Sequence, residues 1–208
     1  MNYSDNILYY DVVECLVAAL ASKDTYTASH SKRVADTSYK LGSFLNLNHR
    51  DLELLHISAY LHDIGKIGLS DYIIHKKERL TNDEWELIKE HPKIGYDILS
   101  KADWLKPIAE IILYHHENYD GTGYPFKLKG TSINFISRII AVCDSIDAML
   151  TNRPYRKCLT YECCKQEIVR NKNKKYDPGI VDCLISNWDS IIVNYYNIVP
   201  LKYKYIGT

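Results

Sequence analysis

The 208 residues suffice for one domain with a substantial hydrophobic core and are few for two. With 46% hydrophobic residues, 25% charged residues and zero formal net charge, the composition is ordinary globular and implies no general attraction to nucleic-acid polymers. No stretch approaches the roughly 18 apolar residues of a membrane span. The N-terminus also lacks the basic leader of a signal peptide, so we expect a cytoplasmic protein without membrane insertion.

The hydrophobic spacing predicts an all-α fold. In chain order we expect helices over about 5–22, 27–45, 49–62, 106–116, 133–150, 161–171 and 178–186. Between the third and fourth of these, we expect a loop over 65–71 and a capping box from Thr81 to Glu84 that opens a further helix. Pro92 is expected to begin another helical turn. About the last twenty residues carry no clear pattern.

Six cysteines lie at positions 15, 143, 158, 163, 164 and 183, and no two of them form a C-x-x-C pair. Several fall within apolar helical patterns, so we expect them to be reduced and buried. Reduced thiols agree with a cytoplasmic location.

Two motifs place metal-ligand residue types at predicted helix ends, HDIGK at 62–66 and HHENYDGTGYP at 115–125. In the first, His62 and Asp63 are candidate ligands and Lys66 is suited to meet a phosphate. In the second, the glycines let the chain leave the helix sharply and pass close to a ligand. The two motifs together indicate a metal-dependent phosphohydrolase rather than a binding scaffold.

Four predicted helices each direct a His or Asp side chain at the core. The four side chains lie in line with apolar residues at helical spacing: His30, His62, His116 and Asp144. A lone His on an apolar face is usually an ordinary core residue, but Asp is almost never fully buried without a partner. Four such helices in one chain favour shared cations. His and carboxylate donors suit Fe, Mn or Zn better than Mg or Ca.

These residues resemble the HD-GYP family, a subset of the HD-domain metal-dependent phosphohydrolases. The resemblance covers about residues 10–186 and includes Asp24 to His30, both motifs above, His91-Pro92, Arg138 to Asp144, Arg153 to Arg156, and Tyr176 to Pro178. It implies an HD-domain helical bundle around a metal cluster. We therefore expect a single domain over 1–208, with its core at about 10–186 and a C-terminal extension at 187–208.

The resemblance also implies a ligand set: His30, His62, Asp63, His91, His115, His116 and Asp144. Asp63 would bridge the ions, while Glu117 and Asp120 would orient the histidine ligands. Family members with three metals carry a Glu four residues before the first histidine, where this chain has Tyr26. We therefore expect two divalent ions, Fe or Mn, with Zn or Ni as alternatives in purified protein.

By the same resemblance, the activity would be hydrolysis of cyclic di-GMP to linear pGpG, with GMP as an alternative end product. Attack by a metal-bridging hydroxide is expected, with Asp63 and Lys66 as the catalytic residues. Lys66 would also hold the substrate phosphate, together with Arg153 and Arg156. Tyr124 would either line the guanine pocket or shape its own loop.

Several alternatives remain open at this point. The substrate could be another cyclic dinucleotide, such as cyclic GMP-AMP, or another phosphate ester. The protein could be a signalling adaptor that binds diguanylate cyclase domains through the GYP loop. It could be a binuclear iron oxygenase, although Lys66 and the GYP loop favour phosphate chemistry. The apolar stripe of the first helix either packs on the core or forms a homodimer contact: Leu8, Val12, Cys15 and Ala19.

Overall fold

The computed structural model describes residues 3–152 and 157–192, without the side chains of residues 3–10 and 25–28. The α-helices are α1 (Tyr3–Lys23), α2 (Thr25–Phe44), α3 (His49–Leu61), α4 (Asp71–Ile74), α5 (Asn82–Ile88), α6 (His91–Leu99), α7 (Lys106–Leu113), α8 (Phe135–Leu150), α9 (Tyr161–Arg170), α10 (Pro178–Ser186) and α11 (Trp188–Ile192). Short 3-10 helices are η1 (Ile64–Gly68), η2 (Asp103–Leu105) and η3 (Gly130–Ser132). The described residues contain no β-strand, which confirms the all-α prediction.

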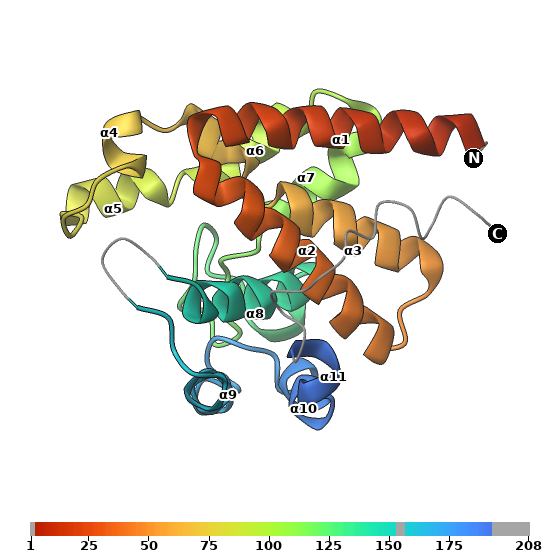
Figure 1. Cartoon of the computed structure of the whole chain (residues 1–208), viewed down its shortest axis with the longest axis vertical. Helices are drawn as coiled ribbons and strands as arrows, with labels where there is room; N and C mark the ends of the chain where they lie inside the picture. The colour runs from red at the N-terminus through yellow and green to blue at the C-terminus, as the bar shows by residue number, and fades with distance from the viewer. Residues whose placement is uncertain (1–2, 153–156, 193–208) are drawn as a thin grey trace.

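In space, α1 lies along one side of the molecule, α8 crosses the middle, and α9 to α11 form the opposite side (Figure 1). The pair α4 and α5 projects to one flank (Figure 1). None of the described helices is both long and apolar enough to cross a bilayer. Arg153, Arg156 and the end of the chain from 193 onward lie outside the described residues.

The core consists of two buried apolar clusters. One joins α1 to α6 and α7 and contains Val17 and Ile108. The other joins α2, α8 and α10 and contains Val34, Ile140 and Ile180. Leu61, directly before the first motif, and Ile64, within it, belong to the first cluster. The motif is therefore held by the core itself rather than by a surface loop.

Local signals explain the observed helix boundaries. Thr81 and Glu84 form the expected capping box at the start of α5. The Asn134 side chain accepts the amide hydrogen of Ile136, so α8 begins two residues later than expected. Part of the segment predicted as a loop after Asp63 forms η1. Helix α11 was not foreseen, because the C-terminal pattern was unclear.

One expectation about side-chain burial is wrong, and one of the two alternatives for α1 does not hold. All six cysteines are free, but Cys15, Cys158 and Cys163 are exposed. In α1, the stripe residues Val12 (36% exposed), Cys15 and Ala19 are exposed, whereas Val13, Val17 and Leu20 face the core. The side chain of Leu8 lies outside the described residues. Because apolar residues occupy both faces of this helix, its spacing could not identify the buried one.

Candidate metal centre

The described structure brings the seven predicted ligands together from five places in the chain. His30 lies in α2, and Asp144 lies in the middle of α8. The others lie at or just beyond helix ends, where the chain turns: His62, Asp63, His91, His115 and His116. These positions let short chain segments aim side chains inward without interrupting a helix.

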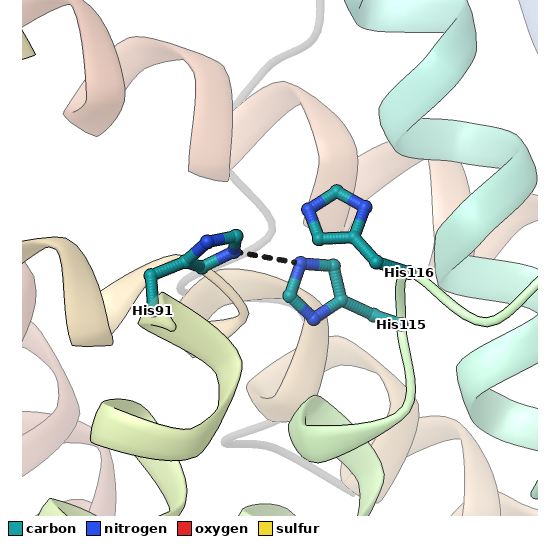
Figure 2. Close-up of side chains that lie close together, drawn as sticks. All are labelled: His91, His115 and His116. Atoms are coloured by element: carbon teal, nitrogen blue, oxygen red, sulfur yellow. Dashed lines mark hydrogen bonds between the residues drawn. The ribbon is translucent and has the colours of Figure 1, made fainter. Parts of the chain in front are cut away.

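The ligand atoms form two groups that share no residue, and a third set, His62, Asp63 and His115, connects them. In the His30 group, the atoms of His30, His62 and Asp144 lie within 4.8 Å of one another. In the His91 group, the same holds for His91, His115 and His116, whose rings converge in Figure 2. Each group therefore offers three donors to one ion.

Asp63 lies between the two groups. Its Oδ1 is 3.4 Å from Nε2 of His91, while its Oδ2 is 3.4 Å from Nε2 of His62 and 3.6 Å from Nε2 of His30. The two oxygens of one carboxylate thus face different groups. This is the arrangement a bridging ligand requires.

For three of the five histidines, a backbone carbonyl determines which ring nitrogen faces inward. In each case Nδ1 donates to the carbonyl three residues earlier: His62 to Ala59 (2.7 Å), His91 to Ile88 (2.7 Å) and His115 to Ile112 (2.5 Å). A neutral imidazole whose hydrogen is on Nδ1 has its lone pair on Nε2. The Nε2 atoms are therefore available as metal donors.

The spacing of these donors fits a divalent ion. Nε2 of His30 is 3.2 Å from Nε2 of His62, and Nε2 of His91 is 3.3 Å from Nε2 of His115. Two nitrogens each about 2.1 Å from one ion and separated by roughly 100° would be about 3.2 Å apart. Between His91 and His115 two lone pairs face each other and repel, and a cation between them would remove the repulsion.

The electrostatics of the centre also suit metal binding. Burial lowers the pKa of His91 to about 3 and that of His116 to about 4, so both rings are neutral near pH 7. Burial opposes ionisation of Asp63, but Lys66 and the surrounding histidines hold the pKa of this carboxyl well below its usual range. His30 differs, because the effect of burial is outweighed by Asp144 and Asp147, which raise its pKa to about 9. An ion bound at Nε2 of His30 would therefore have to displace a proton near pH 7.

Two of the predicted substrate residues border the centre. Lys66 Nζ donates to Asp63 Oδ2 at 2.6 Å. The Tyr124 ring lies against His116, with 4.9 Å between ring centroids and 30° between planes. Burial raises the pKa of Tyr124, and the charges of Asp144 and Asp63 add to this effect. The predicted contacts Arg153 and Arg156 lie outside the described residues.

Glu117 and Asp120, expected to orient histidine ligands, instead hold their own loop. Glu117 accepts the amide hydrogens of Phe126 (2.7 Å) and Leu128 (3.0 Å). Asp120 accepts the amide hydrogen of Thr122 at 2.9 Å. The reason is local, because the loop folds back beside these carboxylates and presents amides that need acceptors.

The residue that does orient a ligand is Asp147, which the sequence reasoning missed. Its Oδ2 lies 2.7 Å from Nδ1 of His30, and the residue is fully buried. Asp147 follows Asp144 by one helical turn, so the two carboxylates lie on the same side of α8. That spacing was a usable signal in the sequence.

A cavity of about 670 Å³ opens between α8 and α9, with Ser145, Met149, Gln166 and Tyr176 in its wall. Ser145 directly follows the ligand Asp144. Among the described residues, no predicted site residue lines this cavity. It is thus separate from the two ligand groups.

Comparison with known proteins places this centre in context. Residues 14–180 match the family described as HD domain. The chain is 35% identical over 172 residues to the cyclic di-GMP phosphodiesterase response regulator RpfG of Xanthomonas campestris, covering 82% of this chain and 46% of RpfG. It is 32% identical over 184 residues to the 3'3'-cGAMP-specific phosphodiesterase 2 of Vibrio cholerae, covering 88% of this chain and 35% of that protein. The chain thus spans less than half the length of these relatives.

The fold also matches a solved structure. The crystal structure of the cyclic GMP-AMP-specific phosphodiesterase V-cGAP3 of V. cholerae superposes with a TM-score of 0.66 at 21% identity. The match covers 92% of this chain and 54% of the other. At this identity the likeness supports the helical architecture alone.

Proposed function

Because the chain belongs to the HD-domain family, within its HD-GYP branch, we propose that it is a metal-dependent phosphodiesterase that hydrolyses cyclic di-GMP. The observation that carries the proposal is the position of Asp63. Its two oxygens face two groups of His and Asp donors, and the ammonium of Lys66 lies beside it. A paired metal site next to a fixed cation suits an anionic phosphodiester better than a redox reaction.

The two groups would hold two divalent ions, for which we propose Fe or Mn because the donors are imidazoles and carboxylates. When bound, such ions offset charge on the phosphodiester and lower the pKa of coordinated water. Lys66 would bind the phosphate as a point charge, which its ionic contact with Asp63 positions. Tyr124, packed on His116, would limit access of water and substrate from the loop side.

Four further features belong to the same proposal. We propose linear pGpG as the first product, because opening the ring needs one hydrolysis, and GMP would require a second. A cytoplasmic location, docking of diguanylate cyclase domains through the GYP loop, and a homodimer through α1 remain predictions.

The test is cyclic di-GMP hydrolysis by anaerobically purified protein, with metal content counted on the same sample. Turnover with about two Fe or Mn ions per chain would support the proposal. Two bound ions without turnover of any cyclic dinucleotide would overturn it. That outcome would favour another phosphate ester or an adaptor role.

A second substrate, 3'3'-cGAMP, is favoured by one observation. A relative with 32% identity over 184 residues is named as specific for that dinucleotide. Comparing kcat/KM for the two substrates on one preparation would decide between them. If kcat/KM were higher for 3'3'-cGAMP, that dinucleotide would replace cyclic di-GMP as the proposed substrate.

A further inference from the structure

Asp147 is a buried carboxylate that belongs to neither ligand group. It is fully buried in α8, and its Oδ2 lies 2.7 Å from Nδ1 of His30. Arg33 holds the same carboxylate, with Nε 2.6 Å from Oδ1 and Nη2 3.1 Å from Oδ2. Two side chains of α2 therefore hydrogen-bond to one carboxylate of α8.

These hydrogen bonds restrict both the position and the rotation of the His30 ring. His30 and Arg33 lie one turn apart on α2, so their side chains reach α8 from the same side. The arginine fork fixes the plane of the carboxylate, and the carboxylate then fixes the ring through Nδ1. Nε2 of His30 is thereby aimed at Asp144, whose Oδ1 is 3.2 Å away.

His30 differs in this respect from His62 of its own group and from two histidines of the His91 group. The Nδ1 atoms of His62, His91 and His115 donate to neutral backbone carbonyls. The Nδ1 atom of His30 instead faces a carboxylate, which makes an imidazole a stronger metal donor. The His30 group also contains Asp144, whereas the His91 group has only imidazoles of its own. Asp63 faces both groups, so it does not remove the difference.

We propose that Asp147, clamped by Arg33, is a positioning residue that makes the His30 group the tighter of the two metal sites, so that this site fills first. The inference rests on the proposed function only in assuming that both groups bind divalent ions. It adds an order of loading and a residue responsible for that order.

The test is a titration of the metal-free 208-residue chain with Mn²⁺, in which free Mn²⁺ is followed by electron paramagnetic resonance. The wild type should bind in two steps of different affinity. Asp147→Asn keeps the shape of the side chain and removes its charge. It should weaken the tighter step by about 10- to 100-fold, the range typical for a residue that supports a ligand, and leave the weaker step unchanged.

Asp177→Asn is the matched control. Asp177 is also a buried carboxylate held by an arginine, Arg138, but its described partners include no histidine. This variant should leave both Mn²⁺ steps unchanged. Thermal unfolding of each variant establishes that the protein is folded during the titration. If Asp147→Asn does not fold, Arg33→Gln removes the clamp alone and should weaken the same step by a smaller factor.

Three results would overturn the inference. They are two equal steps in the wild type, an unchanged tighter step in Asp147→Asn, and equal weakening of both steps in a folded variant. Because the titration contains no cyclic dinucleotide, its result is independent of whether the protein hydrolyses one. If the protein did not hydrolyse cyclic di-GMP, the measured order in which the two metal sites fill would be unaffected.

Discussion

At the scale of single residues, the centre depends on which nitrogen of each histidine carries the hydrogen. The three imidazoles with backbone partners donate through Nδ1 to the preceding helical turn: His62, His91 and His115. Because each carbonyl belongs to the same short segment as its histidine, the ring orientation is set locally. The helix end thus supplies both the ligand and the group that orients it.

Substitution of Lys66 tests whether this residue binds the substrate phosphate without contributing to metal binding. In Lys66→Ala we expect kcat/KM for cyclic di-GMP to fall by about 100-fold, a typical loss for one electrostatic contact in a transition state. Metal content should not fall, because Lys66 contacts Asp63 as a cation and is not a ligand. The measurements are steady-state kinetics and metal analysis of one preparation. Lys93→Ala, which removes a surface pair with Asp97, is the control and should retain activity. Full activity of Lys66→Ala would refute the assigned role.

At the scale of elements, the centre requires η1 and α6 to lie in near contact. A Cβ atom at Gly65 would lie 1.9 Å from the carbonyl oxygen of His91 and 2.5 Å from the amide nitrogen of Gly95. Asp63 precedes η1 and His91 begins α6, so this contact determines the distance between two ligands. A glycine in the HDIGK motif therefore has a packing role, distinct from the ligand chemistry of its neighbours.

Gly65→Ala should push η1 and α6 apart. We expect the free energy of unfolding to fall by about 1–3 kcal/mol, because overpacking against backbone atoms is hard to relieve. The number of bound metal ions should fall as well. Denaturant unfolding and metal analysis would measure both quantities. Gly179→Ala serves as the control, since its Cβ would meet only Asp177 Oδ1 at 3.4 Å. Unchanged metal content and stability in Gly65→Ala would contradict the packing argument.

The GYP loop is a second element held by one side chain. Glu117→Gln removes the charge that accepts the amides of Phe126 and Leu128, bonds of a kind worth about 1.5–3 kcal/mol each. We expect a raised KM for cyclic di-GMP with unchanged metal content, because the loosened loop carries Tyr124. Kinetics and metal counting would check this. An equal loss of metal would instead mean that Glu117 supports the ligands.

At the scale of the whole molecule, the candidate metal ligands come from parts of the chain that belong to different apolar clusters. Val34, on α2 with His30, belongs to one cluster, whereas Leu61, next to His62, belongs to the other. Ions bound between them would join the two halves of the fold. Metal binding should therefore stabilise the entire domain rather than one loop.

Chelation tests this coupling. Removal of metal should lower the unfolding temperature, and Mn²⁺ should restore it, because an ion that binds only the folded state adds about 2.7 kcal/mol at 100 times its Kd. Thermal unfolding followed by circular dichroism is the measurement. In His91→Gln, which lacks one ligand, the shift on adding Mn²⁺ should be smaller. Identical unfolding temperatures with and without metal in the wild type would contradict the coupling.

The sequence by itself determined the helical fold and the positions of the candidate ligands. Helical spacing is a local property, and it indicated that His30, His62 and Asp144 face inward. The helix expected over 106–116 ends at Leu113, so His116 is placed by the turn after α7 and not by helical spacing. Which partner each inward side chain meets depends on segments far apart in the chain. Only the tertiary structure therefore showed that Asp147 supports His30, that Glu117 holds the loop, and which side of α1 is buried.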